Sequence, residues 1–394
     1  MLWLLFNQTR RNQLMDFAKM PELRIGNLKA RLPIIQGGMG VGISLSGLAA
    51  AVANEGGIGV IAAVGMAMLK PNRQKSYRET NIIELRNEIQ KARTLTDGII
   101  GVNIMMALTD YEALLLASVE EGADIVFLGA GLPLKVPRLL TPERLRDGAT
   151  RAAPIVSSAR AANVILKSWE KYNCVPDAFV VEGPLAGGHL GFKKIQLDDP
   201  DYTLERIVTG VIETVKPYEQ RFGKRIPVIA AGGIYTGEDI LKYLQLGVSG
   251  VQMATRFVTT HECDADIKFK QAFVNAQKGD TVIIESPVGL PGRAIKNTFL
   301  EDVSAGAKKP FKCPWKCLHT CNFKTTPYCI ALALANAQKG ELDNGFVFAG
   351  ANAYRAKKIV SVKEVFDALK EEYAAAIGDS SSERTVQYEE LSVA

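Results

Sequence analysis

Residues 226–246 read IPVIAAGGIYTGEDILKYLQL, and this stretch shows the pattern on which the whole chain is built. An apolar run ends in two glycines, and an amphipathic helical pattern follows it directly. Apolar runs of this kind are typical of strands that are covered on both faces of a parallel sheet. Seven further runs share this character, at 32–36, 58–63, 98–106, 124–129, 153–158, 177–183 and 250–257.

Helical patterns follow nearly all of these runs, so strands and helices alternate in one long series. Such alternation indicates a parallel α/β fold, and eight units fit a closed (β/α)8 TIM barrel of roughly 250 residues. A doubly wound open sheet is the alternative. We expect these parts in chain order: a lead-in at 1–20, the barrel at 21–260, an inserted cap or substrate domain at 261–346, a return to the barrel with a last helix at 347–376, and a polar, frayed tail at 377–394.

The composition is that of a globular protein, because 47% of the 394 residues are hydrophobic and 23% are charged. Disorder as the main state is excluded. The net charge of +5 is a weak bias over this length, and no long Lys/Arg block indicates nucleic-acid binding. The N-terminal apolar run is too short for a signal peptide, and the longest apolar stretch, Ile43–Leu69, is interrupted. We predict a cytoplasmic protein without a membrane segment or a nucleic-acid partner.

Glycine-rich motifs follow several of the apolar runs. They are GGMG at 37–40, GAG at 129–131, EGPLAGGHLG at 182–191 and AGGI at 231–234, and Asn103 closes the third run. In barrel enzymes this end of the strands carries the active site. Glycine lets the backbone approach a ligand closely and adopt positive φ. We therefore count Gly187 and Gly188 among the cofactor contacts, together with Glu182, which begins the same motif. Each motif taken alone is also compatible with a tight turn.

The AGGI motif is the most specific of these, because the loops after strands seven and eight form the usual phosphate site of a TIM barrel. The backbone N–H groups of Gly232 and Gly233 are expected to bind phosphate oxygens, and a helix N-terminus is expected to add positive charge. Met253, Ala254 and Thr255 complete this predicted cradle. No P-loop lysine is present, which favours a cofactor that stays bound.

His189 is one of three histidines and lies among three glycines, without the apolar periodicity of a core position. An imidazole can act as base, acid or hydrogen-bond donor near neutral pH. We therefore predict a catalytic role for His189. His261 and His319 have no such context and are expected to be surface or structural residues.

Four of the six cysteines fall within seventeen residues, in KCPWKCLHTCNFKTTPYC: Cys313, Cys317, Cys321 and Cys329. The spacing matches neither common zinc sites nor common ferredoxin sites. In a helix, the first three would lie on one stripe. Buried free thiols, an iron–sulfur cluster and zinc remain open alternatives for this group.

Taken together, these motifs resemble the nitronate monooxygenase (2-nitropropane dioxygenase) family, which includes the FabK-type FMN-dependent enoyl-ACP reductases. The stretches that carry the resemblance are IIQGGMGVGIS, the asparagine of GVNIMM, VEGPLAGGHLGF, PVIAAGGI and MATRF. The resemblance runs from about Pro21 to Leu369. It implies a barrel with FMN at its mouth and an inserted substrate domain. It further implies roles for the following residues: Gly38, Met39, Gly40 and Asn103 at the flavin ring, Gly232, Gly233, Ala254 and Thr255 at the phosphate, and His189 in the active site.

Three functions are compatible with these residues. The first is FMN-dependent oxidation of alkyl nitronates or nitroalkanes. The second is reduction of an enoyl-ACP thioester, with NAD(P)H reducing FMN. The third is an electron carrier or redox sensor with flavin and a metal cluster, which only the cysteines support, since the cysteine cluster departs from the family pattern. A small-molecule substrate is expected, and the oligomeric state is not readable from the sequence.

Overall fold

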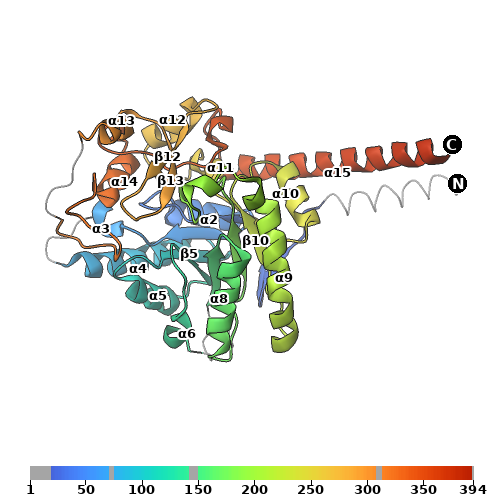
Figure 1. The fold of residues 1–394 in the computed structure, drawn as a ribbon, viewed down its shortest axis with the longest axis horizontal. Helices are drawn as coiled ribbons and strands as arrows, with labels where there is room; N and C mark the ends of the chain where they lie inside the picture. Colours follow the sequence, from blue (N-terminus) through green and yellow to red (C-terminus); the bar gives the residue numbers. More distant parts are fainter. Residues whose placement is uncertain (1–18, 71–74, 142–149, 308–312, 393–394) are drawn as a thin grey trace.

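The protein is described by a computed structural model covering residues 19–70, 75–141, 150–307 and 313–392, with the backbone alone for 379–392. Figure 1 shows a barrel surrounded by helices, a smaller unit over one end of it, and a long C-terminal helix that projects from the body. All but the last two residues of the lead-in predicted at 1–20 lie outside the described residues.

Eight parallel strands form the barrel: β3 (Ile34–Gln36), β4 (Gly59–Ala62), β5 (Ile100–Met105), β6 (Ile125–Gly129), β7 (Arg151–Val156), β8 (Phe179–Glu182), β10 (Val228–Ala231) and β11 (Gly250–Met253). Each strand pairs with the next barrel strand along the chain, and β11 pairs with β3. The ring closes between β3 and β4, where the Gln36 N–H donates to the Ile58 carbonyl and the Ile58 N–H donates to the Ile34 carbonyl, both at 3.0 Å. This closed ring confirms the TIM barrel and excludes the doubly wound alternative.

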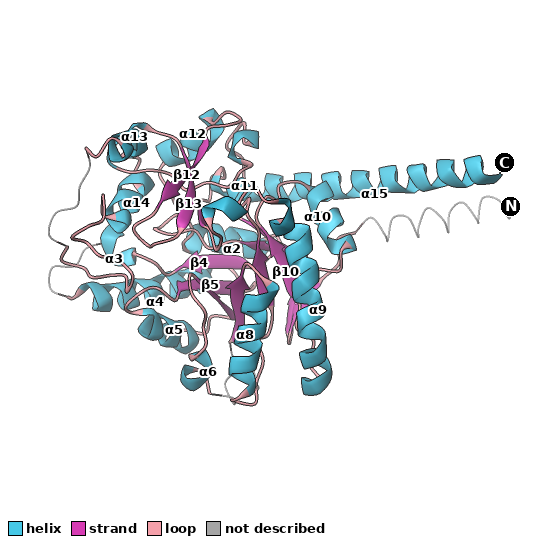
Figure 2. Cartoon of the chain, in the orientation of Figure 1, coloured by secondary structure: helices cyan, strands magenta, loops and turns pink. Residues whose placement is uncertain are grey.

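Longer helices cover the outside of the strands (Figure 2), and short ones lie in the connecting segments. In chain order the helices are α2 (Ser46–Asn54), α3 (Met66–Leu69), α4 (Tyr77–Leu95), α5 (Tyr111–Glu120), α6 (Val136–Leu139), α8 (Ala159–Glu170), α9 (Leu204–Phe222), α10 (Gly237–Gln245) and α11 (Thr255–Val258). Local sequence explains several of their ends. Ser76 and Thr236 begin α4 and α10 with capping boxes, and Gly223 ends α9 in the left-handed conformation.

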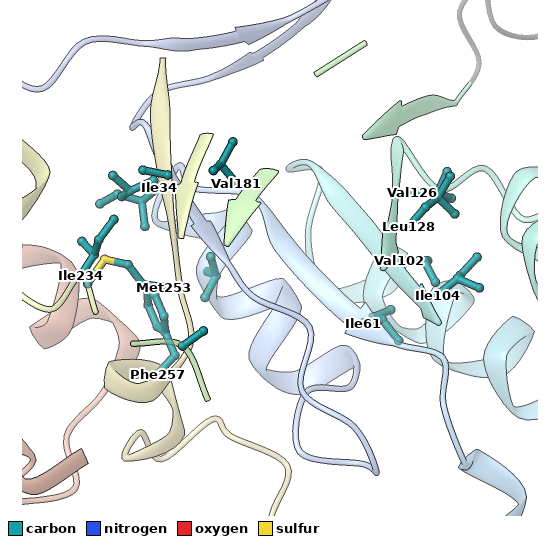
Figure 3. Packing of buried hydrophobic residues seen from close by; sticks show 14 of the residues in the cluster. Ile34, Ile61, Val102, Ile104, Val126, Leu128, Val181, Ile234, Met253 and Phe257 are labelled. Atoms are coloured by element: carbon teal, nitrogen blue, oxygen red, sulfur yellow. The ribbon is translucent and has the colours of Figure 1, made fainter. Parts of the chain in front are cut away.

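In most barrel strands, alternate residues belong to two different hydrophobic cores. In β6, Val126 and Leu128 pack in the large core that includes helix side chains, whereas Ile125 and Phe127 pack in a smaller core of strand residues. Figure 3 shows residues of the larger core on several strands, Val126 and Leu128 among them. Both faces of each strand are thus buried, which explains why the strands are near-continuous apolar runs.

A short N-terminal hairpin belongs to the smaller core. Its strands, β1 (Leu23–Ile25) and β2 (Leu28–Ala30), contribute Leu23, Ile25 and Ala30, all of them buried. The hairpin packs against strand residues and contributes nothing to the cavity described below.

The smaller unit contains α12 (Ile267–Asn275), β12 (Thr281–Glu285), β13 (Pro291–Ile295), α13 (Thr298–Ser304) and α14 (Ile330–Gln338). Strands β12 and β13 form a hairpin whose turn contains Gly289 at φ +87°. A third strand, β9 (Gly188–His189), comes from the barrel loop after β8 and pairs with β13. The cap sheet is therefore built partly from a barrel loop. The exact domain boundaries, near 260 and 346, stay predictions.

The last helix, α15 (Val362–Ser392), is longer than the sequence analysis predicted. The predicted boundary at 377 between helix and frayed tail was wrong, since the backbone stays helical through Ser392. Residues 362–392 contain one glycine and no proline, and their glutamates, alanines and arginine favour helix. No helix in the described part of the chain is long and apolar enough to span a membrane.

Candidate functional site

A cavity of about 270 Å³ lies where the carboxyl ends of the barrel strands meet the cap. Ligand sites of this size and position are common in TIM barrels. All of the predicted barrel-site residues line it: Gly38, Met39, Gly40, Asn103, Glu182, Gly187, Gly188, His189, Gly232, Gly233, Met253, Ala254 and Thr255. The cap contributes Val288 and Phe348 to its walls. The fold therefore brings together motifs that are far apart in the sequence.

One wall of the cavity presents a group of unpaired backbone donors. Gly232 and Gly233 have φ of +92° and +86°, a conformation that favours glycine. Among the described residues, the N–H groups of Gly232, Gly233, Ala254 and Thr255 donate to no protein acceptor. The Asn352 side-chain amide donates to the Gly233 carbonyl at 2.6 Å and holds the turn in place. Such converging N–H groups are a typical anion site.

Two helices begin near this cradle, and they differ in what they offer. At the start of α10, the Asp239 carboxylate accepts hydrogen bonds from the N–H groups of Tyr235 and Thr236 at 2.8 and 2.9 Å, and Glu372 accepts from the Gly237 N–H at 2.8 Å. These N–H groups are therefore already paired. The short helix α11 begins at Thr255, inside the cradle, so its first N–H lies with the donors of the Gly232 turn.

GGMG and Asn103 form another part of the cavity wall. A Cβ atom at Gly38 would lie 2.3 Å from the Asn103 Cβ, and a Cβ at Gly40 would lie 1.9 Å from the Val64 Cγ1. Only glycine therefore fits at both positions. GGMG follows β3, which pairs with β11, so this motif lies beside the strand that leads into Ala254 and Thr255. Strand β5, which carries Asn103, lies four strands around the ring from β10, so Asn103 lies across the cavity from the Gly232 turn.

Gln252 is a site residue that the sequence analysis missed. It lies on β11 and lines the cavity, and within the described part of the chain no partner reaches its buried Oε1. A buried amide oxygen without a partner indicates a place for a ligand donor. Its signal in the sequence was its position, as the one polar residue inside the apolar run GVQM.

His189 lies on β9, at the junction of barrel and cap. Its Nε2 is 2.7 Å from the Ser286 Oγ, and which of the two donates depends on the imidazole tautomer. The Phe348 ring packs edge-on against the imidazole at 5.0 Å between centroids. Burial lowers the pKa of His189 to about 4, so the ring is neutral at neutral pH.

Arg293 holds the loop that carries His189, a role that the sequence analysis did not predict. The guanidinium is buried and donates to the carbonyls of Pro184 and Ala186 at 2.6 and 2.7 Å. It lies on β13, and its backbone pairs with Gly188. This contact joins the cap strand to the glycine-rich loop, which places His189 at the cavity.

Glu182 ends β8 and lines the cavity with a half-buried side chain. Burial raises the pKa of its carboxyl to about 7, and no opposite charge offsets the effect. A carboxyl in this state can exchange a proton near neutral pH. It can also donate a hydrogen bond to a ligand while it is protonated.

The four clustered cysteines line a second cavity, of about 340 Å³. The helical stripe considered for them does not form, because residues 313–329, which include Pro314 and Pro327, are irregular and α14 begins only at Ile330. Burial and the three neighbouring thiols raise the pKa of Cys317 to about 12. Within the described ranges, no group of three or more His, Cys, Asp or Glu side chains has the geometry to bind a metal ion.

The remaining histidines agree with their prediction, since His261 and His319 are both exposed. Of these, His319 borders the cysteine-lined cavity. Neither lines the barrel cavity.

Comparison with known proteins gives consistent results. The family model for nitronate monooxygenase matches residues 22–372. A probable nitronate monooxygenase from Staphylococcus aureus is 29% identical over 303 residues, which are 70% of this chain and 79% of that protein. The structure of FabK from Thermotoga maritima superposes with a TM-score of 0.66 at 27% identity, covering 90% of this chain and 95% of that one. A nitroalkane oxidase from Streptomyces ansochromogenes, 24% identical with a TM-score of 0.67, covers 88% and 97% and shows the same fold.

Proposed function

The chain belongs to the nitronate monooxygenase family and is an oxidoreductase, and on that premise we propose that it uses FMN to oxidise alkyl nitronates and nitroalkanes. The observation that carries the proposal is the cavity at the barrel mouth. One wall offers unpaired N–H donors suited to a phosphate, and the same cavity is lined by the glycine backbone of GGMG and by the Asn103 side chain.

The residues present fit FMN in three respects. The N–H groups of Gly232, Gly233 and Thr255 would hold the phosphate through backbone, as the absence of a P-loop lysine requires. Gly38 and Gly40 line the cavity beside Asn103, so that backbone would face a flat ring there. The unpaired Gln252 Oε1 can accept a hydrogen bond from a ligand N–H or O–H.

FMN, when bound, would take electrons from the substrate and pass them to an acceptor such as oxygen. The chain's own groups would bind the substrate and move its proton. His189 is neutral, so its imidazole can accept the α-proton of a nitroalkane as a base. Toward a nitronate, which is already an anion, the ring N–H would instead donate a hydrogen bond to a nitro oxygen.

Ser286 gives His189 a fixed orientation for either task. Its hydroxyl lies 2.7 Å from Nε2 and also accepts a hydrogen bond from the Val288 N–H at 3.3 Å. Among the described residues, Nδ1 of His189 has no hydrogen-bonding partner. One ring nitrogen is therefore held by the cap while the other remains available to a substrate.

NAD(P)H-dependent reduction of an enoyl thioester is the second candidate. The similarity to FabK from Thermotoga maritima, at 27% identity over 90% of this chain, favours it. The same cavity would then admit the thioester, and His189 would donate a hydrogen bond to its carbonyl or relay a proton. Glu182 could share that role, because its pKa of about 7 keeps part of the carboxyl protonated.

Turnover assays separate the two candidates. FMN-loaded protein is supplied with propyl nitronate in air, and oxygen uptake and nitrite release are followed. A parallel sample receives NADH or NADPH with a crotonyl thioester. Nitronate-dependent oxygen uptake with nitrite release supports the proposal. Thioester-dependent NAD(P)H oxidation without any nitronate turnover would replace it with the reductase.

A further inference from the structure

The segment that carries the cysteine cluster has an unusual charge pattern. Residues 303–340 contain six lysines and no aspartate or glutamate. A surface loop of ordinary composition would carry both signs. A basic, acid-free environment complements a bound group that has negative charge, such as a centre ligated by several thiolates.

The four cysteine side chains border one space. Cys313, Cys317, Cys321 and Cys329 all line the cavity of about 340 Å³, together with the aromatic side chains of Trp315 and Phe323. Cys317 is buried and the other three are half-buried. Thiols and aromatic side chains thus line one space, and the exposed Lys316 and His319 border it at the surface.

Backbone hydrogen bonds attach this segment to the barrel. The Thr109 N–H donates to the Cys317 carbonyl at 3.1 Å, and the Thr109 hydroxyl donates to the Lys316 carbonyl at 3.0 Å. The His319 N–H donates to the Ala107 carbonyl at 2.9 Å. The second of the four cysteines is thus fixed against the loop after β5.

The fourth cysteine is fixed by a helix. Cys329 is the N-cap residue of α14, and its carbonyl accepts a hydrogen bond from the Ala333 N–H at 3.0 Å. The start of α14 therefore sets the position of the fourth cysteine.

We propose that Cys313, Cys317, Cys321 and Cys329 bind an iron–sulfur cluster of the 4Fe–4S kind. Four cysteine thiolates are the usual ligand set of such a cluster. A single zinc ion fits less well, because Zn–S bonds of about 2.3 Å would draw the four sulfurs together around one point. These thiols instead border a space of about 340 Å³, and among the described residues no three of them converge on a single ion, whereas a cluster holds its ligands apart around several irons.

The cluster site shares a wall with the barrel cavity. Cys317, Leu318, Ile330 and Ala331 line both spaces. A cluster bound here would therefore lie directly beside whatever occupies the barrel cavity. The binding site itself does not depend on the proposed function, since none of the ligands belongs to the predicted flavin contacts.

Metal and sulfide analysis tests the proposal. The full chain is produced and purified without oxygen, with iron supplied, and iron, acid-labile sulfide, zinc and FMN are measured on the same sample. We expect about four irons and about four sulfides per chain, and an electron paramagnetic resonance signal after reduction with dithionite. Less than about a tenth of an equivalent of iron after anaerobic reconstitution, or one zinc per chain in its place, would overturn the proposal.

Matched cysteine variants assign the ligands. Cys317→Ser and Cys321→Ser should lose at least half of the iron and change the resonance signal. Cys174→Ser and Cys263→Ser are the controls, because both thiols are buried but lie outside the cavity. If the two cavity variants keep the full iron content and an unchanged signal, the assignment is wrong. FMN content is measured separately, so loss of flavin would count against the proposed function and not against the cluster.

Discussion

Gly233→Ala tests the backbone cradle at the barrel mouth. Gly233 has a φ of +86°, and an alanine in such a conformation costs about 1–2 kcal/mol. The new Cβ would lie 3.0 Å from the Leu185 Cβ, but Leu185 is 48% exposed and can move aside. The protein should therefore still fold, with the turn rotated to relieve the strain.

Rotation of the turn would misdirect the Gly233 N–H. A hydrogen bond to a charged group contributes about 1.5–3 kcal/mol, so the dissociation constant of FMN should rise about 10- to 150-fold. Gly279→Ala is the matched control, because Gly279 has a φ of +101° and open space around its Cβ position, far from the cavity. It should lose similar stability and keep its affinity for FMN.

Fluorescence titration of the flavin-free protein with FMN measures this difference, and thermal unfolding checks both variants. If Gly233→Ala binds FMN within about threefold of the wild type, a change of less than 1 kcal/mol, the turn at Gly232 and Gly233 does not hold the phosphate. Equal weakening in both variants would show that the effect comes from general destabilisation.

Three further outcomes are expected. His189→Ala should retain FMN but lose about 10²–10⁴-fold in turnover, whereas the exposed His261→Ala should not; turnover within about threefold of wild type would exclude a catalytic role of that size. Glu182 has a pKa of about 7 in the folded protein against an ordinary 4.5, so the free energy of unfolding should fall as pH rises from about 4.5 to about 7 and the carboxyl ionises. The Glu182→Gln variant should not show this fall, which is at most about 3 kcal/mol, when denaturant melts are measured between pH 5 and 8. Arg293→Met should lower the free energy of unfolding by about 2–4 kcal/mol, because two buried carbonyls lose their donor. Arg206→Met is the control, because Arg206 is exposed and its loss should change the free energy of unfolding by less than about 0.5 kcal/mol. Equal changes for the two variants in urea melts would contradict this role of Arg293.

The barrel was predictable from the sequence because its signals are local. Each strand is a short apolar run buried on both faces, and each is followed by a helical pattern, so eight repeats of one unit are visible without any long-range information. The candidate site followed from the same rule. Once the strands are assigned, their carboxyl ends must meet, and GGMG, Asn103 and AGGI become neighbours.

Contacts between segments far apart in the chain could not be predicted in this way. Ser286 meets His189 only because β9 joins the cap hairpin, a pairing across 97 residues that no local pattern encodes. The start of α10 is satisfied by Glu372, from a helix more than 130 residues later. The first N–H groups of α10 look available in the sequence until this distant partner is known.

The C-terminal helix and the cysteine segment show two other limits. Polar composition suggested a frayed tail, yet residues without proline can continue a helix that packing has already started, as in α15. The spacing of Cys313, Cys317 and Cys321 was compatible with a helical stripe, but the backbone of this segment is irregular. In both places the local pattern allowed more than one backbone conformation.

Anaerobic reduction of the bound flavin tests the central claim most directly. FMN-loaded protein is mixed without oxygen with propyl nitronate, NADH or NADPH in parallel, and the flavin absorbance is followed. The account predicts fast bleaching by the nitronate and slow or no bleaching by either nicotinamide. Fast bleaching by a nicotinamide with none by the nitronate would contradict it, as would a chain that remains colourless after FMN is added.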